Sequence, residues 1–197
     1  KKNIILIFDE CTSGFRNCFG GLHKVFNVKP DMAMFGKALG NGHAVTAVIG
    51  KKEIMEAAQK SFISSTFWTE RMGSVAGLAT LNEMERIRSW EIITKTGKKI
   101  KKNWKKLAKS HNLKISVSGL DALCSFSFDS VNSNKYKTLV TQEMLKKKYL
   151  ASNQIFITIY HTKKVIDEFI NKLDPVFKKI KYFENNNISS KKFLKDK

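Results

Sequence analysis

The chain has 197 residues, of which 42% are hydrophobic, and it carries a formal net charge of +19. A chain of this size and composition can bury a sizeable core, enough for one domain and part of a second. No run approaches the apolar length of a membrane span and no signal peptide opens the sequence, so we expect a cytoplasmic protein with no membrane partner.

The excess positive charge comes from lysine, because 32 lysines stand beside only 4 arginines. Basic proteins that bind nucleic acids favour an arginine-rich stripe with interleaved aromatic residues. The lysines here are scattered along helical segments instead, so we expect no nucleic-acid partner, and a basic nucleic-acid-binding protein is kept as an alternative.

The three cysteines, Cys11, Cys18 and Cys124, form no CxxC pair and have no histidine at metal-ligand spacing. This pattern indicates free thiols in a reducing compartment and no metal site.

Hydrophobic patterning in the first part of the chain predicts strands that alternate with loops and helices. The continuous apolar run 3–8 is typical of a strand buried on both faces of a parallel sheet. A glycine-rich loop at 11–28 and a second short buried strand at 32–35 follow it. After these we expect a strand at 44–49 that stops at Gly50, a helix at 52–60 and a long helix at 73–89 with small residues early.

The second part of the chain has a different pattern. Apolar residues recur at steps of three and four from Trp90 to Leu107, which predicts an amphipathic helix with a lysine-rich outer face. We then expect strands at 115–117, 123–128 and 155–160, and helices at 136–148 and 163–180, with a polar, frayed tail at 181–197. Strands packed with helices on one face indicate a small α+β domain.

Two residues stand out as candidates for chemistry. Asp9 ends the first apolar run, which puts a carboxylate at the C-terminal tip of a buried strand, where α/β proteins meet their ligands. Lys37 follows the second strand and is framed by Gly36, Gly40 and Gly42; such glycines let the backbone approach a bulky group. A lysine in such a place can be desolvated enough to act as an amine nucleophile. Together they are what a pyridoxal phosphate site needs: a carboxylate for the pyridine nitrogen and an amine for the aldehyde.

At these residues the sequence resembles the class III, fold-type I pyridoxal-phosphate aminotransferases, and within them most closely the branch that resembles glutamate-1-semialdehyde 2,1-aminomutase. The residues that match the family pattern are Ile5, Leu6, Phe8, Asp9, Glu10, Gly14, Phe15, Pro30, Asp31, Gly36, Lys37, Gly40 and Gly42. Two later segments match in the same order, SSTFWTERMGSVAGLATL at 64–81 and YHTKKVID at 160–167. The resemblance runs from the first residue to about residue 180.

The resemblance implies an α/β fold. Residues 1–89 would be the C-terminal part of a large cofactor-binding domain, with a mostly parallel sheet, helices and a connecting long helix. Residues 90–180 would be a small C-terminal α+β domain, followed by the polar tail 181–197. Because family members are about twice this long, it also implies that the chain is the C-terminal half of such an enzyme, with the phosphate loop and the ring-stacking aromatic residue in the half upstream.

The resemblance also implies roles for single residues. Lys37 would be the catalytic residue that binds pyridoxal 5'-phosphate as a Schiff base and moves the proton, and Asp9 would hold the pyridine nitrogen protonated. Cys11 takes the place of a Val or Ile packed beside the ring, and Thr66 would contact the cofactor phosphate of the neighbouring subunit in a homodimer. The substrates would be a small-molecule amino donor and a keto or aldehyde acceptor, in transamination or in an aminomutase reaction.

Each residue also has a plainer interpretation. Asp9 is compatible with a strand-end turn or a helix cap, Lys37 is one of 32 lysines, and Thr66 is compatible with a β-turn hydroxyl. We expect Glu10 to tie down the loop after the strand and His161 to be structural, ahead of an N-cap at Thr162. The family's usual Gly-Asn-Pro is replaced by TER at 69–71, where Arg71 is either a substrate clamp or, as we expect, a surface or interface salt-bridge residue. A catalytically silent fragment is a further alternative.

Overall fold

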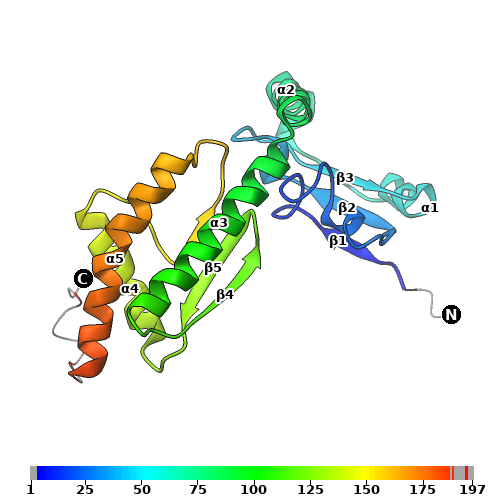
Figure 1. Ribbon diagram of the computed structural model, residues 1–197. Coiled ribbons are helices and arrows are strands. Elements are labelled where there is room, and N and C mark those ends of the chain that lie inside the picture. Colours follow the sequence, from blue (N-terminus) through cyan, green and yellow to red (C-terminus); the bar gives the residue numbers. More distant parts are fainter. Residues whose placement is uncertain (1–3, 187, 189–193, 195–197) are drawn as a thin grey trace. The chain divides into compact units, whose positions relative to one another are not determined.

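The computed structural model describes residues 4–186, 188 and 194, and the chain divides into two compact units, Lys1–Ile92 and Ile93–Lys197 (Figure 1). The first unit is built on a three-stranded sheet in the order β1 (Ile7–Asp9), β2 (Met32–Phe35) and β3 (Ala47–Gly50). Strands β1 and β2 are parallel, with Asp9 opposite Met34, and β3 runs antiparallel to β2. The C-terminal ends of β1 and β2 therefore lie at the same edge of the sheet.

Short helices and one long helix complete the first unit. The single turns Leu22–Lys24 and Lys37–Leu39 follow β1 and β2, and α1 (Lys52–Met55) continues into the turn Glu56–Lys60, as predicted for 52–60. Another turn, Thr66–Thr69, leads into α2 (Arg71–Ile87). Helix α2 ends where Arg88 adopts a left-handed backbone, and α3 (Ser89–Ser110) begins directly after it. The two predicted helices on either side of this break are confirmed.

The core of the first unit is small. Ala33, Phe35 and Leu39 are buried, and partly buried side chains such as Phe8 and Val45 pack against them. The prediction that the first strand is buried on both faces is wrong here: β1 begins only at Ile7, and the Ile7 side chain is 50% exposed. The physical reason is that little of the described chain packs on the faces of β1, where only Phe8 is partly buried.

The second unit is an antiparallel sheet with helices on one face. The strands are β4 (Ile115–Leu120), β5 (Leu123–Phe128) and β6 (Gln154–Phe156), in that order, and the helices are α3, α4 (Ser133–Lys146) and α5 (Lys163–Asn185) (Figure 1). Cys124, Phe126 and Phe128 point from β5 into the core, and Ser127 on the other face is exposed, which confirms the predicted alternation. Trp104 of α3 is fully buried, with its ring 4.8 Å from that of Phe126.

Several boundaries in this unit differ from the prediction. Strand β4 extends to Leu120 instead of residue 117, and α4 spans Ser133–Lys146 instead of 136–148. Strand β6 ends at Phe156 instead of residue 160. Helix α5 continues to Asn185, because Phe183 still packs on the core, so the first five residues of the predicted polar tail are helical. The Thr162 hydroxyl accepts a hydrogen bond from the Val165 amide at 3.4 Å, which confirms the predicted N-cap. Within the described part of the chain, none of the helices has both the length and the apolar character that crossing a membrane requires.

Candidate active site at the ends of two parallel strands

The parallel pairing of β1 and β2 brings Asp9 and Lys37 to one end of the sheet. Asp9 is the last residue of β1, and Lys37 lies two residues beyond the end of β2, at the start of a helical turn. Residues that follow adjacent parallel strands emerge at the same sheet edge, which is the usual ligand site of α/β proteins. Both side chains are exposed there.

The backbone around Lys37 is tightly specified. Lys37 itself has a φ of 43°, in the left-handed region that non-glycine residues seldom occupy. At Gly40, an added Cβ would lie 2.2 Å from the carbonyl oxygen of His43, so only glycine fits. Unusual backbone conformations of this kind persist only where the surrounding structure fixes them, and they cluster at functional sites. The turn thus fixes the backbone from which the Lys37 side chain extends.

Cys11 lies between the two charged residues. Its amide donates a 3.0 Å hydrogen bond to Oδ1 of Asp9, and its sulfur would lie 3.6 Å from a Cβ added at Gly36, next to Lys37. The pKa of the Cys11 thiol is raised, by its partial burial first and then by the Asp9 carboxylate, while the Lys37 charge opposes the shift. The structure therefore brings Asp9, Cys11 and Lys37 together, as the sequence predicts.

Glu10 holds the loop that follows β1, which agrees with its predicted structural role. The side chain is 1% exposed and accepts hydrogen bonds from the Ser13 hydroxyl, from the backbone amide of His23 at 2.9 Å and from that of Leu22. The His23 ring lies 3.1 Å from the same carboxylate. Burial alone raises the pKa of Glu10, but these hydrogen bonds outweigh it and the pKa is lowered. His23 was not among the predicted residues, because nothing in its local pattern points to Glu10.

Within the described residues, Thr66 and Arg71 form no hydrogen bond with the cluster of Asp9, Cys11 and Lys37. Thr66 opens an exposed helical turn that Ser65 caps through the Phe67 amide, and Arg71 is the exposed first residue of α2. Among the residues that the structure describes, no hydrogen bond or ion pair joins Thr66 to Asp9 or Lys37. The contact predicted for Thr66, with a cofactor bound to a second subunit, remains a prediction.

One contact of the cluster was not predicted. The Lys37 amine donates a hydrogen bond to Oγ1 of Thr12 at 2.5 Å. Thr12 occupies a variable position of the sequence pattern, between Asp9 and Gly14. The only signal that could have drawn attention to it is its place three residues beyond the strand-end carboxylate.

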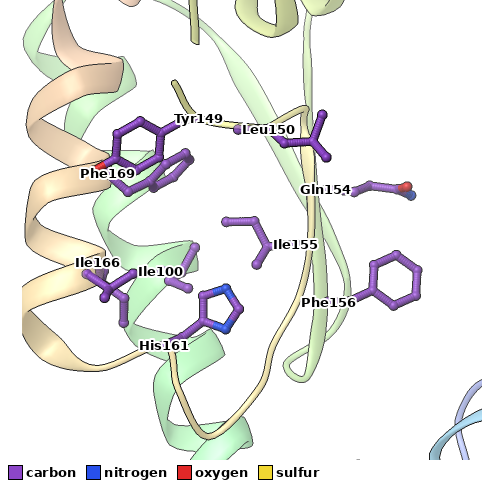
Figure 2. Close-up of a pocket in the computed structure, with 11 residues that line it drawn as sticks. Ile100, Tyr149, Leu150, Gln154, Ile155, Phe156, His161, Ile166 and Phe169 are labelled. Carbon is purple, nitrogen blue, oxygen red and sulfur yellow. The ribbon is translucent and has the colours of Figure 1, made fainter. Parts of the chain in front are cut away.

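The second unit has a pocket of about 330 Å³ (Figure 2). It is mostly apolar, with Ile100, Ile155 and Phe169 among its lining residues, and His161 and Gln154 are polar members. Nδ1 of His161 accepts a hydrogen bond from the Thr158 amide at 3.0 Å, which fits the structural role expected for this histidine.

The donor set at the end of β1 and β2 fits pyridoxal phosphate. The group needs an acidic partner for a protonated ring nitrogen and a primary amine for its aldehyde. Asp9 is a carboxylate and Lys37 carries a primary amine, and in the described part of the chain they form no ion pair with each other that would occupy both. Cys11 between them is compact enough to lie against a ring.

Comparisons with known proteins agree with this chemistry. The family model for aminotransferase class-III matches residues 1–173. A 3-aminobutyryl-CoA aminotransferase of Cloacimonas acidaminovorans is 35% identical over 158 residues, which is 80% of this chain and 37% of that protein. A glutamate-1-semialdehyde 2,1-aminomutase of Methanocaldococcus jannaschii is 29% identical over 194 residues, which is 90% of this chain and 45% of that protein.

Solved structures show the same fold. The FumI protein of Sphingopyxis sp. MTA144, in its PLP internal aldimine form, has a TM-score of 0.83 at 18% identity, covering 95% of this chain and 46% of that one. An omega-transaminase from Sphaerobacter thermophilus has a TM-score of 0.75 at 19% identity, covering 88% and 44%. The predicted α/β fold class is confirmed, and the chain spans less than half the length of these relatives. The family match over most of its length shows that the chain belongs to the class III aminotransferases.

Proposed function

We propose that this chain is the C-terminal half of a pyridoxal-phosphate-dependent aminotransferase. The observation that carries the proposal is the meeting of Asp9 and Lys37 at one end of two parallel strands, with Cys11 between them. Because the chain spans under half of the relatives it matches, the activity belongs to the longer protein. Its substrates would be a small-molecule amino donor and a keto or aldehyde acceptor.

The chemistry divides between the cofactor and the chain. Pyridoxal phosphate, when bound, supplies an aldehyde for an amine and a ring that accepts electrons from the substrate carbon. Lys37 would hold the cofactor covalently and, once an incoming amine replaces it, carry a proton from the substrate carbon as a general base. Asp9 would keep a proton on the ring nitrogen, because a carboxylate close to that nitrogen favours its charged form. Cys11 would pack beside the ring.

The finer features of the proposal concern assembly and compartment. Thr66 would contact the cofactor phosphate bound to a second copy, in a homodimer; its exposure on the turn Thr66–Thr69 supports this. A cytoplasmic location is supported by three cysteines that are all free in the structure.

The test uses the natural full-length protein with added pyridoxal phosphate. We expect a visible absorption band that disappears when an amino donor is added and returns with a keto acceptor. Lys37→Ala should lack the band, and Lys52→Ala, which removes an exposed lysine of α1, should keep it. A Lys37→Ala protein with a normal band would overturn the proposal.

An aminomutase is the second candidate, because one of the similar relatives is a glutamate-1-semialdehyde 2,1-aminomutase. Such an enzyme returns the amino group to a neighbouring carbon of the same skeleton and needs no separate acceptor. Product analysis with an isotopically labelled amino donor distinguishes the two: a transaminase moves the label to another molecule, and an aminomutase keeps it within one.

A further inference from the structure

The hydrogen bond between Lys37 and Thr12 lies inside the proposed site and has no role in the function described so far. It joins the Lys37 amine to the Thr12 hydroxyl oxygen at 2.5 Å, across 25 residues of sequence. Thr12 is half-buried, whereas Lys37 is exposed, so the contact ties an exposed side chain to a partly buried one. A free lysine side chain loses roughly 2 kcal/mol of rotamer entropy on being held in one position, and a partner that holds it beforehand reduces that cost at the moment of reaction.

The backbone around Thr12 is held by several contacts. The Thr12 carbonyl accepts a hydrogen bond from Nε of Arg16 at 2.7 Å, and the Gly14 amide donates to the Glu10 carbonyl at 2.8 Å. Gly14 packs so closely that an added Cβ would lie 2.7 Å from both the Glu10 carbonyl oxygen and the Phe35 ring. These contacts hold the backbone of the turn that carries Thr12.

Among the described residues, the Thr12 hydroxyl is the acceptor to which the Lys37 amine is hydrogen-bonded. The neighbouring Glu10 carboxylate is buried against Ser13 and His23. A neutral hydroxyl is also suited to this position for a chemical reason. It orients an amine as an uncharged hydrogen-bond acceptor.

We propose that Thr12 is a positioning residue whose hydroxyl holds the free Lys37 amine in the direction from which it condenses with the aldehyde of pyridoxal phosphate. In that condensation the amine first gives up its extra proton to solvent. Its nitrogen then bonds to the aldehyde carbon, the carbon–oxygen bond breaks, and the oxygen leaves as water with the two amine hydrogens. This inference rests on the proposed function, because it requires that Lys37 bind the cofactor.

The test measures the capture of the cofactor rather than turnover. The cofactor-free, full-length protein is mixed with excess pyridoxal 5'-phosphate, and the rate constant for the appearance of the visible absorption band is measured. Borohydride reduction and peptide mass spectrometry then test whether the cofactor is attached at Lys37. Thr12→Val removes the hydroxyl at nearly constant shape, and Thr12→Ser keeps it. Thr138→Val is the matched control, because Thr138 is exposed on α4 and its hydroxyl donates only to the Asn134 carbonyl.

We expect Thr12→Val to slow capture about tenfold, which corresponds to the loss of about one hydrogen bond. Thr12→Ser should stay within about twofold of the natural protein, and Thr138→Val should match it. Equal rates for Thr12→Val and Thr12→Ser, whether both fast or both slow, would overturn the positioning role and leave the proposed function intact. A natural protein that captures no cofactor on Lys37 would overturn the proposed function, and the role of Thr12 with it.

Discussion

Replacing the buried carboxylate of Glu10 tests how the loop after β1 is held in place. It is 1% exposed and fixes the loop after β1 by accepting hydrogen bonds from Ser13, Leu22 and His23. Glu10→Gln keeps the volume and an acceptor but removes the charge. Hydrogen bonds to charged groups contribute roughly 1.5–3 kcal/mol and neutral ones roughly 1. We therefore expect Glu10→Gln to lose about 2 kcal/mol of local stability, after allowing for the hydrogen bonds that the amide oxygen still accepts.

Amide hydrogen exchange read by mass spectrometry measures this loss where it occurs. A change of about 2 kcal/mol corresponds to roughly thirtyfold faster exchange in peptides that cover residues 11–28. Glu83→Gln is the matched control, because Glu83 forms an exposed pair with Arg86, and such pairs contribute little. If exchange of residues 11–28 in Glu10→Gln stays within about threefold of that in the natural protein, the Glu10 carboxylate does not hold this loop.

The same carboxylate gives a pH dependence of known sign. Because the pKa of Glu10 is lowered in the folded protein, its contribution is fully present above its ordinary value of 4.5 and is lost as the pH falls through the lower folded value. We therefore expect acid to weaken protection of residues 11–28 in the natural protein. The natural protein and Glu10→Gln should become more alike as the pH falls, and a difference between them that grows in acid would contradict this assignment.

Three further predictions concern packing and reactivity. Gly14→Ala should destabilise the first unit by about 1–3 kcal/mol, since the new Cβ would overlap the Phe35 ring; limited proteolysis should show it, and unchanged resistance would count against the packing described. Trp104→Ala should cost the second unit about 3–5 kcal/mol, since the indole is fully buried; denaturant unfolding measures this, and a loss below 1 kcal/mol would contradict it. Cys124 is buried, and burial raises the pKa of its thiol to about 11. Iodoacetamide at about pH 8 should therefore leave Cys124 unmodified in the folded protein and modify it in urea. Rapid labelling of the folded protein would disprove its burial.

Local patterns were enough for much of the second unit. The alternation of Cys124, Phe126 and Phe128 predicts which face of β5 is buried, because side chains of a strand alternate between its faces. Thr162 lies before a helical apolar pattern and caps it, since its hydroxyl can satisfy a free amide of the first turn. Both predictions depend on residues that are close in sequence.

The site was predictable only in part. The strand-end position of Asp9 and the glycine frame of Lys37 gave the pair, and the parallel register of β1 and β2 explains why they meet. The contact of Lys37 with Thr12 and that of His23 with Glu10 join residues 25 and 13 positions apart through folded loops, which no periodicity encodes. The exposure of β1 was mispredicted because an apolar run indicates a strand that can be buried, and burial depends on what packs against it.

The central claim is that Lys37, among 32 lysines, is the residue that binds pyridoxal phosphate. The most direct measurement is borohydride reduction of the full-length protein loaded with cofactor, followed by peptide mass spectrometry to locate the reduced pyridoxyl group. We expect one modified residue, Lys37, and no stable label in Lys37→Ala. A label on another lysine, or one that persists in Lys37→Ala, would contradict it.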